Sequence, residues 1–235
     1  MKIRKNEFSF EESLKYLDEF AQQMIDIKGL RLFRNIDTDE MPVEQIVKVF
    51  CAAMNIKVIK KFSHAGYHME FVYAGAISQI LGVLQSSSLL QHVDMQADGG
   101  ILALLNAPMK KDVEDIINLA AQVRSINDVV LRKFHLPLGE QVISVGIDYG
   151  PISYFTSAYT NLEGIFYGNA IVRAKMLADA REDSVNVSED IYMNLSDEMK
   201  QNLFKENDMM GETRYYHSPL INIRMRKWVV ENQQG

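Results

Sequence analysis

Five residues between two short apolar runs constrain the fold of this chain more than any other segment. The sequence Gln96-Ala97-Asp98-Gly99-Gly100 separates apolar runs at 89–95 and 101–105. Paired glycines supply the positive φ angles that tight turns require, and runs of this length are typical of strands. The pattern predicts an antiparallel hairpin with an acidic turn. Asp98 is therefore the first candidate functional residue.

The segments around this hairpin alternate between strand and helix patterns. Apolar residues at helical spacing predict helices, and short continuous apolar runs predict buried strands. The predicted strands lie at 45–53, 89–95, 101–105, 140–147, 151–155 and 185–187, and the predicted helices at 62–84, 112–134 and 168–181. Ser188 and the acids after it are predicted to start a further helix, and the tail is predicted to end in strand. The first six elements give an α+β fold with a ferredoxin-like βαββαβ order.

The N-terminal part of the chain differs from the rest. Residues 1–44 are predicted to form an amphipathic helix, starting near Phe8 and ending at Gly29, and a polar connector that contains Pro42. The helix either packs on the main domain or forms a separate partner-binding module. Residues 45–235 are predicted to form the main domain.

Composition narrows the classes of function. The formal net charge of −6 disfavours non-specific binding to nucleic acid, so no nucleic-acid partner is predicted. Cys51 is the single cysteine, which excludes internal disulfides and cysteine-rich zinc sites. The N-terminus lacks the apolar stretch of a signal peptide, and no apolar run is long enough to span a membrane. A cytoplasmic location is predicted.

Several short motifs occur in an order that resembles one known family. The chain resembles the class III nucleotidyl cyclases, which include the adenylate and guanylate cyclases, over about residues 46–204. The motifs are Met54-Asn55-Ile56, Gln96-Ala97-Asp98-Gly99-Gly100-Ile101, Val145-Gly146-Ile147-Asp148-Tyr149-Gly150-Pro151, Tyr167-Gly168-Asn169-Ala170 and Val187-Ser188-Glu189-Asp190-Ile191-Tyr192. The resemblance implies that residues 45–235 are a cyclase homology domain.

The resemblance implies a two-metal site. In the family, two aspartates hold the divalent ions that neutralise the triphosphate and activate the ribose hydroxyl. Asp98 matches the second aspartate, Asn55 stands in place of the first, and Ile56 beside it belongs to the same site. Because hard cations favour carboxylates, a weakened site for Mg²⁺ or Mn²⁺ is expected. Each residue also has a structural interpretation: Asp98 as a turn residue bonded to its own backbone, and Asn55 as a polar strand terminator.

The resemblance also implies phosphate and base contacts. The family's small-residue phosphate turn is replaced by 57–61, where Lys57, Lys60 and Lys61 supply positive charge, or alternatively begin a solvated helix. Asp94 lies at a base-selecting position, where it can accept hydrogen bonds from an amino group. The second base-selecting position holds an isoleucine, so specificity for ATP is not predicted.

The catalytic pair of the late helix is altered. In the family, an Asn and an Arg four residues apart orient the ribose and stabilise phosphate charge, and the aligned positions hold Val172 and Met176. Asn169 and Arg173 have the same spacing on a face rotated by about 60°, so they are the candidate replacements.

Two functions remain open. The first is a nucleotidyl cyclase-like domain, a phosphorus–oxygen lyase if active, that binds a nucleoside triphosphate and converts it at most weakly to a 3′,5′-cyclic nucleotide. The second is an inactive pseudo-cyclase that serves dimerisation, nucleotide sensing or regulation. Because the family builds its sites between two domains, a homodimer, or a heterodimer with a related cyclase domain, is expected.

Overall fold

The computed structural model describes residues 9–11, 14–15, 46–60, 68–139, 141–155 and 165–232. Its described strands form one sheet in the order β2-β3-β1-β4-β6-β8-β7, with β5 paired to β4. The strands are β1 Ile46–Lys60, β2 Leu90–Met95, β3 Ile101–Leu105, β4 Gln141–Phe155, β5 Ile165–Tyr167, β6 Val185–Ser188, β7 Glu206–Met210 and β8 Thr213–Ser218. The helices are α2 His68–Ser86, α3 Lys110–Lys133, α4 Asn169–Ala180, α5 Glu189–Met193, α6 Asp197–Asn202 and α7 Ile223–Glu231. The α+β class and the ferredoxin-like order β1-α2-β2-β3-α3-β4 are confirmed.

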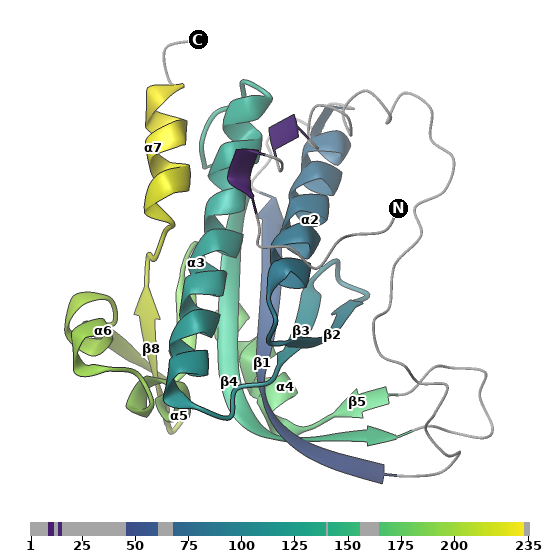
Figure 1. Cartoon of the computed structure of the whole chain (residues 1–235), viewed down its shortest axis with the longest axis vertical. Helices are drawn as coiled ribbons and strands as arrows, with labels where there is room; N and C mark the ends of the chain where they lie inside the picture. The colour runs from purple at the N-terminus through teal and green to yellow at the C-terminus, as the bar shows by residue number, and fades with distance from the viewer. Residues whose placement is uncertain are drawn as a thin grey trace.

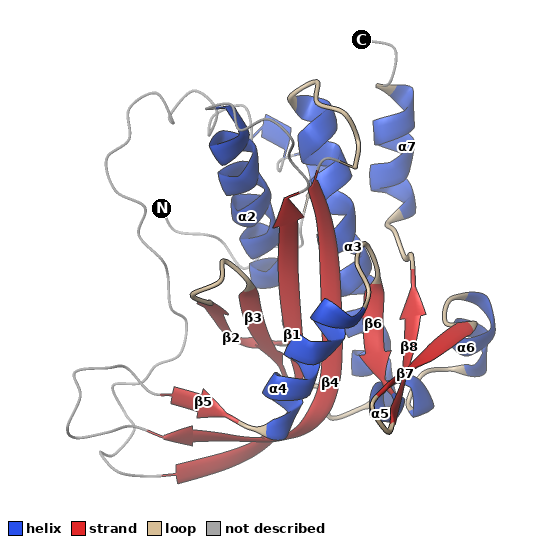
Figure 2. Cartoon of the chain, turned by 180° about the vertical axis from the view of Figure 1, so that it is seen from behind, coloured by secondary structure: helices blue, strands red, loops and turns tan. Residues whose placement is uncertain are grey.

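Helices cover the two faces of the sheet unequally. Helices α2 and α3 pack side by side on one face, with α7 beside α3 (Figure 1). Helix α4 crosses the opposite face over β1 and β4 (Figure 2). Along β1, Met54 and Ile56 belong to the large core under α2 and α3. Cys51 and Ala53 point the other way, into a smaller core under α4.

The central strands β1 and β4 are longer than the sequence predicts. They pair over fifteen positions, from Ile46↔Phe155 to Lys60↔Gln141. The predictions that strands end at residues 53 and 147 are wrong, because both strands continue through polar residues. The predicted start of a helix near residue 62 lies outside the described residues, and α2 is described from His68. Pro151 is tolerated in β4 because it lies between the segments that pair with β6 and with β5.

The tail ends in a helix, not in the predicted strand. Asn222 caps α7, because its side chain accepts hydrogen bonds from the backbone N–H groups of Arg224 and Met225. Met225 and Val229, one helical turn apart, are buried. An N-cap residue followed by apolar residues four apart is a helical pattern, which the alternation in the sequence obscured. The predicted cap at Ser188 is confirmed, since its hydroxyl accepts from the Ile191 N–H.

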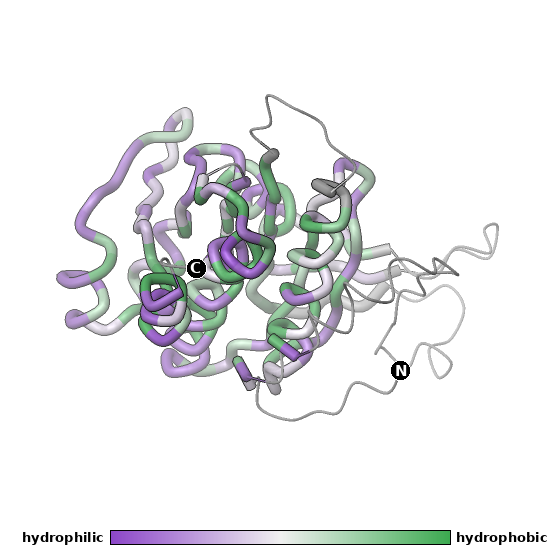
Figure 3. The backbone as a smooth tube through the Cα atoms, turned by 90° about the horizontal axis from the view of Figure 1, so that it is seen from above, coloured by the Kyte–Doolittle hydropathy of each residue, from purple (hydrophilic) through white to green (hydrophobic). Residues whose placement is uncertain are grey.

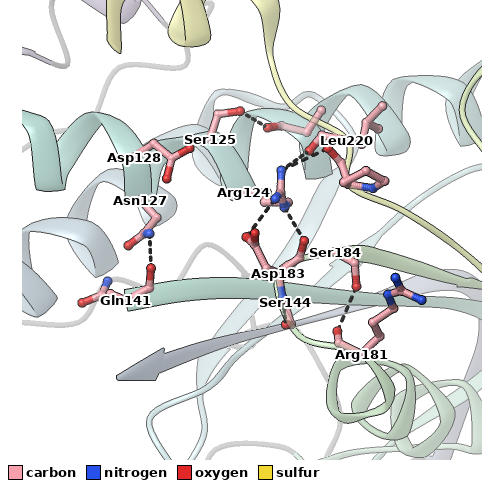
Figure 4. Close-up of polar contacts among 12 residues, drawn as sticks. Arg124, Ser125, Asn127, Asp128, Gln141, Ser144, Arg181, Asp183, Ser184 and Leu220 are labelled. Carbon is pink, nitrogen blue, oxygen red and sulfur yellow. Dashed lines mark hydrogen bonds and ion pairs between the residues drawn. The ribbon is translucent and has the colours of Figure 1, made fainter. Parts of the chain in front are cut away.

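A buried arginine joins α3 to the segments before β6 and α7 (Figure 4). Arg124 of α3 is 9% exposed. It donates to the backbone oxygens of Asp183, Pro219 and Leu220 and pairs with the Asp183 carboxylate at 2.8 Å. One side chain thus joins α3 to the turn before β6 and to the segment before α7.

Most of the predicted N-terminal helix lies outside the described residues. Of it, Phe10 and Leu14 pack against the large core, and the Phe10 ring meets Trp228 of α7 edge-on, with centroids 5.9 Å apart. This contact favours a helix packed on the main domain, and the division at residue 44 stays a prediction. The periphery near α6 and β7 is mostly hydrophilic (Figure 3). No helix in the described ranges is long and apolar enough to cross a membrane.

Candidate functional site

Strand register brings several of the predicted site residues onto one face of the sheet. Asp94 of β2 lies opposite Leu102, which lies opposite Asn55, which in turn lies opposite Gly146 of β4. Directly opposed residues share a face, and neighbouring strands lie about 4.8 Å apart. Leu102 belongs to the small core under α4, so the whole row faces that helix. Asp94 and Asn55 are thus held on one side, two strands apart.

The turn that joins β2 and β3 is held by several hydrogen bonds. The Asp98 carboxylate accepts from the Gly100 N–H at 3.0 Å, and Gly99 adopts a φ of 82°. The Tyr73 hydroxyl of α2 donates to the Gly99 oxygen. The structural interpretation of Asp98 is therefore confirmed, because its side chain bonds the backbone two residues on. One of its oxygens is left for other partners.

That second oxygen pairs with a lysine of α4. Lys175 Nζ lies 2.8 Å from Asp98 Oδ2, and both side chains are about half exposed. The hydrogen bond from Lys175 and the one from the Gly100 N–H lower the pKa of Asp98, which therefore stays a carboxylate at neutral pH. The Lys175 ammonium thus occupies the position beside Asp98 where a bound cation would lie.

Asn55 is a buried mid-strand residue. It is 3% exposed, and its amide nitrogen donates to Gln96 Oε1 of the turn at 2.9 Å. The interpretation of Asn55 as a strand terminator is wrong, because β1 continues to Lys60. Asn55 instead joins β1 to the turn that carries Asp98. The backbone oxygen of Ile56 also faces this turn, 3.3 Å from where a Cβ on Gly100 would lie.

Helix α4 lies unusually close to the sheet. A Cβ on Gly146 would lie 2.0 Å from the Ala174 oxygen and 2.3 Å from the Ala178 nitrogen. Only a glycine permits this contact between the helix backbone and β4. Lys57 of β1 forms an ion pair with Asp179 near the end of the same helix. The close approach explains how residues of α4 reach both β1 and the turn.

Arg173 turns towards its own sheet. Its Nε donates to Asp148 Oδ2 at 2.7 Å, and its Nη2 lies 3.7 Å from Asp190. Asp148 is fully buried on β4, and burial raises its pKa although Arg173 opposes the shift. Arg173 therefore neutralises a carboxylate of its own chain, while Asn169 is exposed at the first position of α4.

The other predicted site residues are the lysines after Asn55 and the two late-helix positions of the family's Asn and Arg. Lys60 ends β1 with a side chain outside the described atoms, and Lys61 lies outside the described residues. The alternative of a helix start at Lys57 is wrong, because Lys57 lies in β1. Val172 and Met176, at the positions of the family's Asn and Arg, are 52% and 47% exposed. Helix α4 thus presents two apolar side chains four residues apart.

Sequence reasoning missed Lys175, Asp148 and Asp179 as functional candidates. A charged residue in the otherwise apolar strand 145–152 was a signal for Asp148, since a buried carboxylate needs a partner. Nothing in the local sequence indicated the pairing of Lys175 with Asp98, because 77 positions and several elements separate them. That contact depends on the position of α4.

The donor set does not fit a pair of divalent ions. Such ions favour several carboxylate oxygens, but at this position the described residues offer the single carboxylate of Asp98, which is already paired. The neighbouring Asn55 carries an amide that is bonded to Gln96. Within the described ranges, no three His, Cys, Asp or Glu side chains gather closely enough to hold a metal ion.

Comparison with known proteins relates this geometry to a fold family. No family profile and no curated protein sequence matches the chain. Among solved structures, a class III adenylyl cyclase-like ATP-binding protein from Pseudomonas aeruginosa is similar over 93% of this chain, with a TM-score of 0.62 and 14% identity. The chain has the class III cyclase fold. It spans about half of that protein, 48% of its length.

Two further structures support the cyclase fold and match over nearly their full lengths. The adenylyl cyclase CyaB from P. aeruginosa has a TM-score of 0.60 at 12% identity, and the match covers 74% of this chain and 95% of CyaB. The guanylyl cyclase Cya2 has a TM-score of 0.59 at 10% identity, covering 75% of this chain and 95% of Cya2. Identities this low establish the fold and leave the chemistry to the residues described above.

A cavity lies on the face of the sheet that α3 and α7 cover. It has a volume of about 430 Å³, and its lining includes Arg124, Asp128, Asp183 and Arg226. Its charges pair among themselves, with Arg124 on Asp183 and Arg226 Nη1 3.9 Å from Asp128. Burial raises the pKa of Asp128. These contacts serve to hold α3, α7 and the turn before β6 together.

Proposed function

We propose that this chain is a nucleoside-triphosphate-binding module of the cyclase fold that works as a dimer and converts its nucleotide at most weakly to a 3′,5′-cyclic product. The observation that carries the proposal is the position of Lys175 at Asp98, beside the row that contains Asn55 and Asp94. This arrangement keeps positive charge for phosphates and a hydrogen-bonding carboxylate for a base. The ATP-binding protein of similar structure supports a nucleotide as the ligand.

Loss of catalytic groups supports the limit on turnover. The family's transition state needs charge stabilisation by metal ions and by an arginine from a late helix. Here Asn55 replaces a carboxylate, and Val172 and Met176 replace the late-helix pair. Arg173, the candidate substitute, is held by Asp148. The same losses favour the pseudo-cyclase alternative, in which binding of nucleotide regulates a partner.

Exposed apolar groups on α4 support the dimer. Val172 and Met176 lie on one face at a spacing of four residues, with Lys175 beside them. Each would lose solvent-exposed apolar area in an interface, at about 25 cal/mol per Å². A dimer through this face would place the nucleotide site at the interface, as the resemblance to cyclases implies.

Turnover and binding should be measured separately. The purified chain is incubated with ATP, GTP, CTP or UTP and with Mg²⁺ or Mn²⁺, and cyclic nucleotide and pyrophosphate are quantified by mass spectrometry. Calorimetry measures binding under the same conditions. We expect at least one triphosphate to bind and cyclic product to be at most a trace. Absence of binding by all four refutes the proposal, and rapid turnover refutes the limit on catalysis.

The dimer has its own test. Sedimentation is compared for the wild type, for Met176→Glu and for a matched control, Met193→Glu, on the exposed surface of α5. We expect Met176→Glu to weaken self-association and the control to leave it unchanged. A wild-type monomer at high concentration, or equal effects of both substitutions, contradicts an interface through α4.

A further inference from the structure

We infer that Lys175 replaces the divalent cation of this site, so that the chain binds its nucleotide without a metal ion. The inference rests on the proposed binding of a nucleoside triphosphate. The donor set of the described residues does not match a two-metal site. Where two carboxylates would hold two dications, this chain has one carboxylate, Asp98, and one ammonium paired with it at 2.8 Å.

Both oxygens of Asp98 are engaged. Oδ1 accepts from the Gly100 N–H, and Oδ2 accepts from Lys175. A divalent ion at this carboxylate would have to displace the ammonium and would then lie next to it, which like charges oppose. The neighbouring oxygens of Gln96 and Ile56 in the described part of the site are neutral, and Asn55 supplies no second carboxylate, which a hard cation favours.

Lys175 keeps donors for a phosphate. An ammonium has three N–H donors, and the contact with Asp98 uses one of them. The Lys175 side chain is 47% exposed, so the remaining donors are open to a ligand. Lysine binds phosphate as a point charge, without the geometric demands of a metal ion. In this arrangement Asp98 positions the ammonium at the turn.

A second ammonium lies on the same side of the sheet. Lys57 follows Asn55 by two residues on β1, so their side chains share a face. Lys57 pairs with Asp179, four residues after Lys175 on α4, and its side chain is 46% exposed. Lys57 of β1 and Lys175 of α4, each paired with a carboxylate, therefore lie where α4 packs on β1. Together they offer a triphosphate two positive charges that belong to the protein.

The test compares nucleotide affinity with and without metal. Calorimetry with ATP, GTP, CTP and UTP is run in excess EDTA and again in excess Mg²⁺. We expect the best ligand to bind with similar affinity in both. Binding of no triphosphate in either buffer means that the proposed function has failed. Binding that requires Mg²⁺ overturns the present inference and leaves the proposed function standing.

Substitutions identify the ammonium responsible. Lys175→Met should weaken metal-free binding by about tenfold to a hundredfold, as expected for loss of a hydrogen bond from a charged group. Lys175→Arg should retain much of the affinity, and Lys111→Met, an exposed lysine on α3, should have no effect. Lys175→Gln serves if Lys175→Met does not fold. Unchanged affinity in folded Lys175→Met or Lys175→Gln overturns the inference.

Metal binding gives a readout without nucleotide. Free Mn²⁺ is followed by electron paramagnetic resonance in the presence of the wild type, of Lys175→Gln and of Lys175→Gln combined with Asn55→Asp. We expect weak binding by the wild type and tighter binding by the double variant. Tight binding of Mn²⁺ by the wild type that is lost in Asp98→Asn overturns the inference.

Discussion

The contact between Gly146 and α4 gives the sharpest test of how the site is positioned. In Gly146→Ala, the new methyl would lie 2.0 Å from the Ala174 oxygen, 2.3 Å from the Ala178 nitrogen and 2.9 Å from the Leu177 carbonyl carbon. All three atoms belong to the helix backbone, so no side chain can rotate to make room. Helix α4 must therefore move away from β4.

The cost follows from the depth of the overlap. Overpacking of a core typically costs about 1–3 kcal/mol, and a clash with helix backbone belongs at the upper end, about 3 kcal/mol. For a domain of this size, each kcal/mol shifts Tm by about 2–4 °C, so Tm should fall by about 6–12 °C. Urea unfolding and calorimetry measure both quantities. Because α4 carries Lys175, nucleotide affinity should fall as well.

Gly82→Ala is the matched control. Gly82 lies within α2, and a Cβ there meets nothing within 4 Å. Alanine in a helix interior is favoured over glycine by about 0.5–1 kcal/mol, so this variant should be slightly more stable than the wild type. If the free energy of unfolding of Gly146→Ala is within about 0.5 kcal/mol of the wild-type value and nucleotide affinity is unchanged, the close packing of α4 on β4 does not position the site.

Three further predictions concern charge in the folded chain. Arg124→Met should lose about 3 kcal/mol in urea unfolding, because it leaves the backbone oxygens of Asp183, Pro219 and Leu220 without their donor; Arg124→Lys should recover only part of the loss. The pKa of His217 is lowered, chiefly by burial and then by Arg181, so as the pH falls the unfolded chain takes up this proton before the folded chain does. The free energy of unfolding should therefore be at its full value above about pH 6.5 and decrease below it. In His217→Gln, the urea midpoint should depend less on pH over this range. Asn55→Asp should lose about 2 kcal/mol at neutral pH and less in acid, in paired urea titrations, because it buries a carboxylate; equal losses at both pH values would contradict burial as the cause.

The parts of the fold set by local chemistry could be predicted from the sequence. The turn at Asp98 was recognisable because Gly99 supplies the positive φ, and Ser188 because a cap is a contact over three residues. The lengths of β1 and β4 were not predictable in the same way. Local rules end a strand at Asn55 or Asp148, but here Gln96 and Arg173 bond those side chains and the strands continue.

The candidate site was predictable in its acidic half only. Asp98 and Asn55 were found by resemblance, and Asn55 lies on β1 beside β3, the strand that follows the turn carrying Asp98. The partner of Asp98, Lys175, comes from α4, whose position depends on Gly146 rather than on any pattern near the turn. The sequence shows Lys175 as one more lysine on a helix. It becomes a site residue only when the helix lies on the sheet.

The replacement of a carboxylate by Asn55 and the presence of Lys175 are electrostatically consistent. Two aspartates would carry two negative charges, which a dication balances and one ammonium does not. With Asn55 neutral, Asp98 and Lys175 cancel, so the turn is stable without any ion. An aspartate at position 55, 3% exposed, would have no cation of its own. Restoring metal binding therefore requires two coupled changes, a carboxylate at position 55 and the loss of the ammonium at position 175, and either change alone leaves the charge unbalanced.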